Sequence, residues 1–401
     1  MKILVTDGNS RAALAICRSL GAKGHHVIVG DHHASSLAAA SKYCKDRCIY
    51  PNPGKHPAAF LNFLEDYVKH FQVDILIPAT DITTLPITEH KARFEPSCKV
   101  PFADFAAISR AANKVDIMLL AQSLGVDIPK SVTISSSKEL KNLTLDFPFP
   151  VVIKPGRSRV LTENGYLYTS VSYAEDLHSL TSQLQQIDPL AFPVLIQERI
   201  NGPGVGIFMC YQNGNPIAAF SHQRLREKPP SGGVSVLRES IPLDPIALSS
   251  AEKLLCALHW NGVAMVEFKR DERDGKPKLM EINGRFWGSL QLAIDAGVDF
   301  PNLLVESTQQ QLKTNYDYNL GVKSRWLYGD FDALLLRLFK HESALQLPPG
   351  SPSKMKYLRD FLRFREKNMK YEICQLNDMN PWLFESWLWL HDLLGFGRTN
   401  Q

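Results

Sequence analysis

The sequence contains no long apolar run and no strong excess of charge of either sign. No segment reaches the roughly 18 consecutive apolar residues of a membrane-spanning helix, so no such helix is expected. Its opening, MKILVTDGNS, lacks the longer apolar stretch and the small-residue cleavage site of a signal peptide. The formal net charge of +4 over 401 residues argues against nucleic-acid binding, which usually requires a strongly basic face.

Cysteine is sparse, and the seven cysteines are scattered and odd in number. This pattern predicts reduced thiols and a cytoplasmic location, because disulfide-rich proteins belong to oxidising compartments. Cys44 and Cys48 lie close together in the sequence, but a structural zinc site needs four ligands and no second pair stands near. We therefore interpret them as two half-buried thiols.

Glycine is scarce where a dinucleotide-binding turn would need it. The first predicted strand is followed by DGNSR, in which Gly8 is the only glycine of the G-x-G-x-x-G fingerprint. Asp31 ends the next strand, where such a fold often places the acid that binds ribose. An NAD-dependent oxidoreductase is therefore a weak alternative, although the turn could still hold a ligand at a helix N-terminus.

The order of the apolar segments predicts three parts. Residues 1–108 alternate strands and helices, which indicates an α/β domain with a parallel sheet and helices on both faces. Residues 109–311 combine helices with antiparallel strands in an α+β region, and one hairpin is expected to turn at residues 213–215. Residues 312–401 are mostly helical.

The last predicted helix is rich in tryptophan and leucine. One of its faces carries Leu383, Trp387, Leu390 and Leu394. We expect this face to pack on the body of the protein; an oligomer or partner contact is the main alternative. A membrane-surface helix is less favoured, because the polar positions of the helix are acidic rather than basic.

Two carboxylates are predicted to oppose each other across a hairpin of residues 263–283. If residues 273–275 form a three-residue loop, Glu267 pairs with Glu281 and Met265 pairs with Asn283. Directly opposed residues point to the same face of a sheet, and so do residues two apart. Glu267, Glu281 and Asn283 would then converge. The other face would bury four apolar side chains: Val266, Phe268, Met280 and Ile282.

Such a cluster of oxygen ligands is typical of a divalent cation site. Opposed carboxylates repel each other, and Mg²⁺ prefers one or two carboxylates together with phosphate and water oxygens. Arg285, just beyond the strand, could bind a phosphate or a carboxylate with two hydrogen bonds. The alternative is that both acids are solvated on an exposed face or are relieved by Lys269. The pattern favours a magnesium–nucleotide site.

These motifs resemble the ATP-grasp superfamily. MVEFKRD followed by KLMEINGRFWGSLQLAIDAGVDF is similar to carboxylate–amine ligase-like members related to the carbamoyl-phosphate synthase large chain and to biotin carboxylase. The resemblance covers roughly residues 1–311. It implies a pre-ATP-grasp α/β domain followed by two α+β lobes. ATP would phosphorylate a carboxylate, and an amine, or alternatively a thiol, would attack the acyl phosphate, with ADP and phosphate as products.

The resemblance also implies roles for single residues. It implies ATP and Mg²⁺ as cofactors, with Mn²⁺ as an alternative to magnesium, and small carboxylates and amines as substrates. The implied magnesium ligands are Glu267, Glu281 and Asn283. The implied phosphate contacts are Lys114, Lys154 and Arg285. The implied adenine site lies at the hinge between the lobes, residues 194–201, with Gln197, Glu198, Arg199 and Ile200.

The sequence departs from the family pattern at two places. The loop KPGRSRVLTENG has Arg157 and Arg159 where many members have a glycine-rich phosphate loop, so arginine contacts would replace backbone contacts. The segment NGPGVG places Pro203 where an acid often binds ribose. These departures keep open the alternative of a degenerate nucleotide-binding or regulatory protein without ligase activity.

The segment SHQRLREKPPSGGVSVLRES concentrates cations around a flexible turn. Such a group of arginines suits a clamp for a carboxylate or an acyl phosphate. We expect Arg224 and Arg238 to orient the acceptor carboxylate. A solvated hairpin is the alternative.

Overall fold

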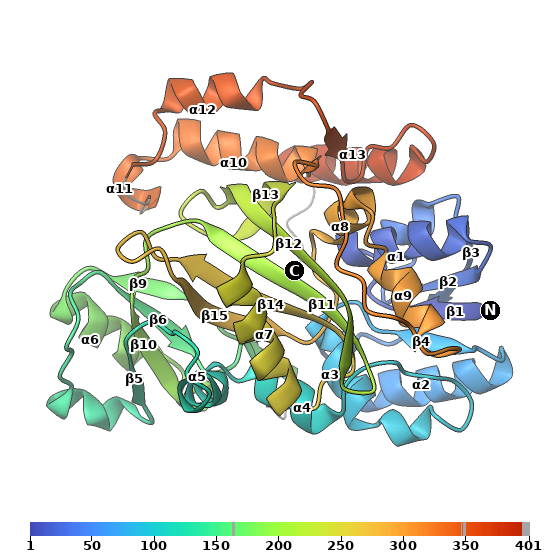
Figure 1. Ribbon diagram of the computed structural model, residues 1–401, viewed down its shortest axis with the longest axis horizontal. Coiled ribbons are helices and arrows are strands. Elements are labelled where there is room, and N and C mark those ends of the chain that lie inside the picture. The colour runs from blue at the N-terminus through green and yellow to red at the C-terminus, as the bar shows by residue number, and fades with distance from the viewer. Residues whose placement is uncertain (163–164, 346, 348–349, 395–401) are drawn as a thin grey trace.

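The computed structural model describes residues 1–162, 165–345, 347 and 350–394 (Figure 1). Its N-terminal part is a four-stranded parallel sheet in the order β3-β2-β1-β4. This confirms the predicted parallel α/β domain. The elements of this part are β1 (Lys2–Val5), α1 (Arg11–Ala22), β2 (His26–Asp31), β3 (Cys44–Ile49), α2 (Pro57–His70), β4 (Ile75–Ile77), α3 (Asp81–Glu89) and α4 (Phe105–Ala112).

The first turn of this domain is built for packing rather than for a dinucleotide. A Cβ atom added to Gly8 would lie 2.4 Å from Oγ of Ser36, so glycine is needed there for close contact between segments. The carboxylate of Asp31 accepts hydrogen bonds from the backbone N–H groups of Asn9 (3.0 Å) and His33 (2.9 Å). The carboxylate of Asp31 therefore stabilises the conformation of this turn.

The middle region begins with a four-stranded antiparallel sheet in the order β5-β10-β6-β9 (green in Figure 1). A separate β7–β8 hairpin follows β6. The residues between β7 and β8, 163–164, lie outside the described residues. The elements are α5 (Lys114–Ser123), β5 (Ser131–Ile134), β6 (Val151–Pro155), β7 (Arg159–Thr162), β8 (Gly165–Tyr168), β9 (Ser172–Ala174), α6 (Leu177–Gln186) and β10 (Val194–Glu198).

A second sheet of seven strands occupies the centre of the molecule, in the order β15-β14-β11-β12-β13-β16-β17. Asn213 and Gly214 both have positive φ in the turn between β11 and β12, as the predicted hairpin requires. The elements up to residue 311 are β11 (Gly204–Gln212), β12 (Asn215–Lys228), β13 (Val234–Ser240), α7 (Pro245–Ala257), β14 (Gly262–Arg270), β15 (Pro277–Asn283), α8 (Leu290–Ala296) and α9 (Phe300–Glu306).

The β14–β15 hairpin confirms the predicted opposition of acids but not the predicted loop. Glu267 pairs with Glu281, yet Arg270 pairs with Pro277, so the connection is longer than three residues. An irregularity between Glu267 and Phe268 restores the register. As a result, Leu279 instead of Met280 lies in the core beside Phe268. Met280 is half-buried, and its Sδ atom is 3.9 Å from Nζ of Lys154.

The C-terminal region contributes strands as well as the expected helices. β16 (Lys323–Arg325) pairs with β13, and β17 (Met369–Tyr371) pairs with β16, so this region completes the central sheet. Helices α10 (Leu327–Phe339), α11 (Glu342–Leu345), α12 (Lys354–Phe361) and α13 (Asn380–Leu393) lie at the top of Figure 1. α10 packs on β12 and β13. Residues 395–401 of the predicted C-terminal part lie outside the described residues.

The predicted apolar stripe of α13 is not the face that packs. Leu383, Trp387, Leu390 and Leu394 are between 51% and 69% exposed. The helix instead contacts α10 through its other side. Trp389 donates a hydrogen bond from Nε1 to Asp332 (2.9 Å), stacks on Tyr328 and meets Phe331 edge to face. Trp382 and Phe384 of the same helix are half-buried against the main core, so both polar and apolar contacts fix this face. No helix among the described residues is both long and apolar enough to cross a membrane.

Two buried carboxylates tie the C-terminal region to the rest of the protein. Glu372, just after β17, accepts from Arg11 of α1 (2.7 Å) and from Arg238 of β13 (2.5 Å). Asp378 accepts from Nε of Arg18 (2.8 Å), also on α1. All of these groups are largely or fully buried, so the ion pairs are protected from solvent screening.

Replacing Asp378 with Asn should destabilise the whole chain, because Arg18 would remain buried without its counter-charge. Breaking a buried pair in this way typically costs about 3–5 kcal/mol, so we expect the free energy of unfolding in urea to fall by roughly 3 kcal/mol. Asp392→Asn, at an exposed position on α13, is the control and should change it by less than about 0.5 kcal/mol. A loss no larger than that of the control would contradict this role of Asp378.

Candidate functional site

Glu267 on β14 and Glu281 on β15 lie side by side, and each is next to a cation from a different segment. Oε2 of Glu267 is 2.5 Å from Nη2 of Arg224 on β12. Oε2 of Glu281 is 3.8 Å from Nζ of Lys114, the first residue of α5. Asn283 donates from Nδ2 to Oε1 of Glu281 (2.9 Å). The predicted convergence of Glu267, Glu281 and Asn283 on one face is therefore present.

The surroundings shift the pKa values of the two acids in opposite directions. Burial raises the pKa of Glu267, with a further increase from the charge of Glu281, and Arg224 only partly offsets this. Burial also acts on Glu281, but the positive charge of Lys114 and the hydrogen bond from Asn283 hold its pKa below the ordinary value. Two adjacent carboxylates that differ in this way are typical of a functional site.

Further cations surround the acid pair. Lys114 is buried, and its Nζ atom donates to Oγ of Ser158 (3.0 Å). Burial lowers the pKa of Lys154 on β6 to about 8, although the nearby charge of Glu281 opposes this. Arg285 is 2.8 Å from Asp81 of the N-terminal domain through Nε, and its Nη2 donates to Oδ1 of Asn283 (3.3 Å).

A cavity of about 450 Å³ joins these groups into one site. This volume lies within the range of pockets that hold small molecules and cofactors. Most of the residues predicted from sequence line it: Lys114, Lys154, Arg224, Glu267, Glu281, Asn283 and Arg285.

The hinge residues lie beside this cavity rather than in its wall. Gln197 is buried and donates to Ser131 (3.0 Å). The carboxylate of Glu198 accepts from the backbone N–H of Lys130 (3.0 Å) and is 2.8 Å from Nη1 of Arg273. The Glu198 carboxylate is thus bonded to protein partners, whereas Oε1 of Gln197 is buried without a hydrogen-bond partner among the described residues.

The two remaining hinge residues contact side chains that do line the cavity. The guanidinium of Arg199 lies 4.9 Å from the ring centre of Tyr173, and the carbonyl of Ile200 accepts from Nζ of Lys269 (3.3 Å). Tyr173 and Lys269 are both in the cavity wall. The hinge backbone is therefore next to the cavity.

The arginine-containing loop after β6 is docked beside the acid pair. Arg157 donates from Nη2 to Oγ of Ser109 on α4 (3.1 Å). A small adjoining cavity of about 50 Å³ is lined by the loop, by α3 and α4 and by the end of β15; it includes Asp81, Lys114, Arg157, Arg159, Glu281 and Asn283. The loop therefore brings arginine side chains to the place where the resemblance led us to expect glycines.

Arg224 and Arg238, predicted to act together, have different positions. Arg224 lines the cavity and is 2.9 Å from Glu227 as well as 2.5 Å from Glu267. Arg238 is fully buried with Glu372 and is not among the residues that line the cavity. The prediction for Arg238 must be corrected, because a guanidinium enclosed by protein partners cannot reach a substrate in this cavity.

Two further residues of the site come from the N-terminal domain and were not predicted from the sequence. Arg11 lines the cavity, and Asp81 holds Arg285. Both follow the ends of parallel strands, Arg11 after β1 and Asp81 after β4. Ligand sites in open α/β sheets lie beyond the carboxyl ends of the strands, so this position was the available signal.

The donor set fits magnesium and a nucleotide. Two carboxylates and one amide supply hard oxygen ligands, and Lys114, Lys154 and Arg285 supply positive charge on the same cavity for phosphate groups. The positive charges of Arg224 and Lys114 offset the negative charges of the two acids, and a divalent cation would do the same. Glu267 and Glu281, with Asn283, are therefore the residues that would hold the metal.

Comparison with known proteins agrees with this chemistry. Residues 191–328 match the family described as "ATP-grasp in the biosynthetic pathway with Ter operon". The carbamoyl phosphate synthase large chain of Saccharolobus islandicus is 23% identical over 230 residues, which are 55% of this chain but 21% of that protein. The chain thus spans about a fifth of that relative. The D-aspartate ligase of Enterococcus faecium is 21% identical over 317 residues, 74% of this chain and 75% of that protein.

The fold of this chain is also similar to that of solved structures. A crystal structure of a biotin carboxylase complex from Campylobacter jejuni matches with a TM-score of 0.63 at 15% identity, over 80% of this chain and 74% of that chain. At this level of identity the match shows the fold. Together with the family match over residues 191–328, it confirms the resemblance found in the sequence: this chain is similar to the carboxylate–amine ligase-like members of the ATP-grasp superfamily.

Proposed function

We propose that the protein is an ATP- and magnesium-dependent ligase that joins a carboxylate to an amine through an acyl phosphate. The observation that carries the proposal is a single cavity lined by a carboxylate pair, an adjacent amide and three cationic side chains that can bind phosphate. The similarity to a D-aspartate ligase supports carbon–nitrogen bond formation, and the biotin carboxylase structure is a complex with beta-gamma-ATP. Attack by a thiol instead of an amine would use the same first step.

The side chains of the cavity have separable roles in this proposal. Lys114, Lys154 and Arg285 bind the phosphates of ATP and stabilise the charge that moves to the leaving ADP. The metal held by Glu267, Glu281 and Asn283 would neutralise phosphate charge. A carboxylate oxygen of the acid substrate attacks the γ-phosphorus, so no protein nucleophile is needed. The amine then attacks the acyl carbon, phosphate leaves, and the nitrogen releases a proton.

A thermal-shift titration with Mg-ATP tests the nucleotide site directly. A ligand that binds only the folded state at 100 times its Kd stabilises it by about 2.7 kcal/mol, so the melting temperature should rise. We expect the rise to require magnesium and to be lost in Glu281→Gln. Release of ADP that depends on an added carboxylate and amine would then establish ligation. A shift without any such release would favour the degenerate nucleotide-binding alternative, and no shift would exclude both.

ATP affinity should weaken in alkaline solution because of Lys154. Its pKa of about 8 means that the ammonium is charged below pH 8 and becomes neutral above it. Bound phosphates favour the charged form, so Kd for Mg-ATP should rise by up to about tenfold per pH unit above pH 8. The Lys154→Arg variant keeps its charge throughout and should show a flatter profile. Identical profiles for the two proteins would rule out Lys154 as a phosphate contact.

The two arginines of the β12–β13 hairpin should respond differently to substitution. Arg224→Gln removes the partner that orients Glu267, and loss of such a supporting contact typically lowers metal affinity or activity by roughly 10- to 100-fold. Arg238→Gln should instead lower stability, by about 3 kcal/mol, because it breaks the buried pair with Glu372. Turnover per folded molecule and urea midpoints measure the two effects. Unchanged turnover in Arg224→Gln would refute its assignment.

A further inference from the structure

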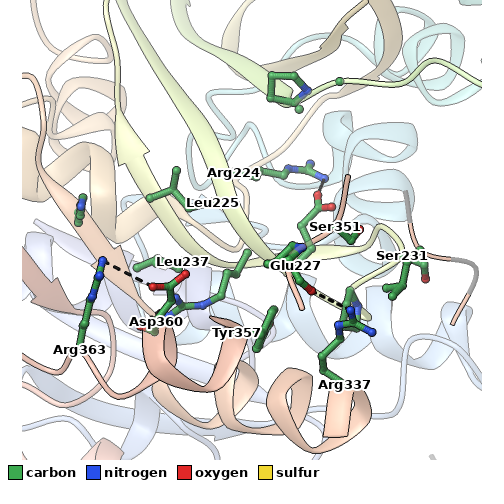
Figure 2. A pocket seen from close by; sticks show the side chains of 18 of the residues that line it. Arg224, Leu225, Glu227, Ser231, Leu237, Arg337, Ser351, Tyr357, Asp360 and Arg363 are labelled. Atoms are coloured by element: carbon green, nitrogen blue, oxygen red, sulfur yellow. Dashed lines mark hydrogen bonds and ion pairs between the residues drawn. The ribbon is translucent and has the colours of Figure 1, made fainter. Parts of the chain in front are cut away.

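A second cavity, of about 350 Å³, lies between the central sheet and the C-terminal region (Figure 2). One side is formed by the end of β12 and by the segment that follows the hinge. The other side includes Arg337 of α10, Tyr357 and Asp360 of α12, and Arg363 just beyond α12. These four residues all follow residue 328, where the family match ends. The C-terminal region therefore supplies one wall of this chamber, and that wall lies outside the matched segment.

The second cavity adjoins the acid-pair cavity. Arg224, Glu227 and Lys269 line both. Arg224 lies at the boundary, because its guanidinium is 2.9 Å from Glu227 and 2.5 Å from Glu267. A substrate in the second cavity would thus have one end beside the place where an acyl phosphate would form.

The wall of this cavity carries charges of both signs, and most are tightly paired. Arg226 is 2.5 Å from Asp330, and Lys323 is 2.5 Å from Glu366. These pairs leave little capacity for a ligand of a single charge. The cavity therefore does not resemble a site for a large polyanion.

Arg363 and Asp360 form a looser pair. Nη1 of Arg363 is 3.6 Å from Oδ1 of Asp360, beyond hydrogen-bond distance, and the Arg363 side chain is 55% exposed. The backbone below them is fixed, because the buried Arg325 donates to the carbonyls of Phe361 (2.8 Å) and Arg363 (3.5 Å). Figure 2 shows Arg363 with Asp360 on one side of the cavity and Arg224 with Glu227 on the other.

Tyr357 adds a polar group that lacks a partner. Its side chain lines the cavity but is only 6% exposed, and its hydroxyl has no hydrogen-bond partner among the described residues. Buried hydroxyls without partners are rare and costly, so such a group in a cavity wall points to a ligand or a water that completes it.

We propose that this chamber binds the amine substrate, and that this substrate is an amino acid or a short peptide. Its amino group lies at the Glu227 end, beside the acid-pair cavity, and its carboxylate lies on Arg363 at the other end. The volume is sufficient for a dipeptide-sized molecule. The assignment rests on the proposed ligase function and specifies its second substrate.

A binding screen in the presence of saturating Mg-ATP tests this assignment. The probes are the twenty L-amino acids and a panel of dipeptides, measured by thermal shift on the full chain. At least one probe should raise the melting temperature above the value with Mg-ATP alone. Its Kd should increase by about 10- to 100-fold in Arg363→Ala, which removes a charged hydrogen bond. The corresponding amine without a carboxylate, such as tyramine for tyrosine, should not bind.

Two further variants separate binding from folding. Arg365→Ala changes an exposed neighbouring arginine outside the cavity and should bind the probe like the native protein. Tyr357→Phe removes a hydroxyl that makes no protein hydrogen bond, so it should fold normally but bind the probe more weakly. The shift from Mg-ATP alone should be the same in all these proteins. If Mg-ATP alone does not raise the melting temperature of the native protein, the nucleotide site itself is refuted.

The chamber assignment is overturned by any of three results obtained while the Mg-ATP shift persists. These are no shift from any amino acid or dipeptide, equal affinity of Arg363→Ala and the native protein, or equal binding of the amine that lacks a carboxylate.

Discussion

The repulsion between Glu267 and Glu281 is the constraint on which the site depends. The hairpin places the two carboxylates directly opposite each other, and the side chains of Glu267 and Glu281 are only 15% and 35% exposed. Such a pair persists only when positive charge is brought to it. Lys114 comes from the start of α5 and Arg224 from β12, so distant segments must meet at the hairpin. The same charges would be rearranged when a divalent cation and phosphates bind.

Buried charge also joins the C-terminal region to the N-terminal domain and the central sheet. Glu372 is bonded to Arg11 of the N-terminal domain and to Arg238 of the central sheet. These pairs fix β17 and, through the sheet, the neighbouring β16. Arg325 of β16 then holds the end of α12, which forms one wall of the second cavity. The position of that wall is therefore set by ion pairs and not only by apolar packing.

Individual strands show which parts of the fold could be predicted from the sequence. The alternation of apolar runs predicted β1, β2 and β4, whose residues are almost all buried. β3 was missed because only Cys48 of its six residues is buried, which leaves no apolar pattern. In the β14–β15 hairpin the register of the acids was correct although the loop was wrong. The longer connection and the irregularity near Phe268 compensate each other, and neither leaves a signal in residue type.

The sequence by itself determined the chemistry: which strands carry acids, an amide, lysines and arginines, and that Glu267, Glu281 and Asn283 share a face. This follows from the period of two in a strand, which is a local property. Only the tertiary structure decided which cations reach the cavity. Arg224 and Arg238 look equivalent in the sequence, yet Glu372, 134 positions beyond Arg238, captures one of them. The tertiary structure likewise decided that α13 packs through Trp389. Its partner Asp332 is placed by α10, and the sequence of α13 alone does not reveal that position.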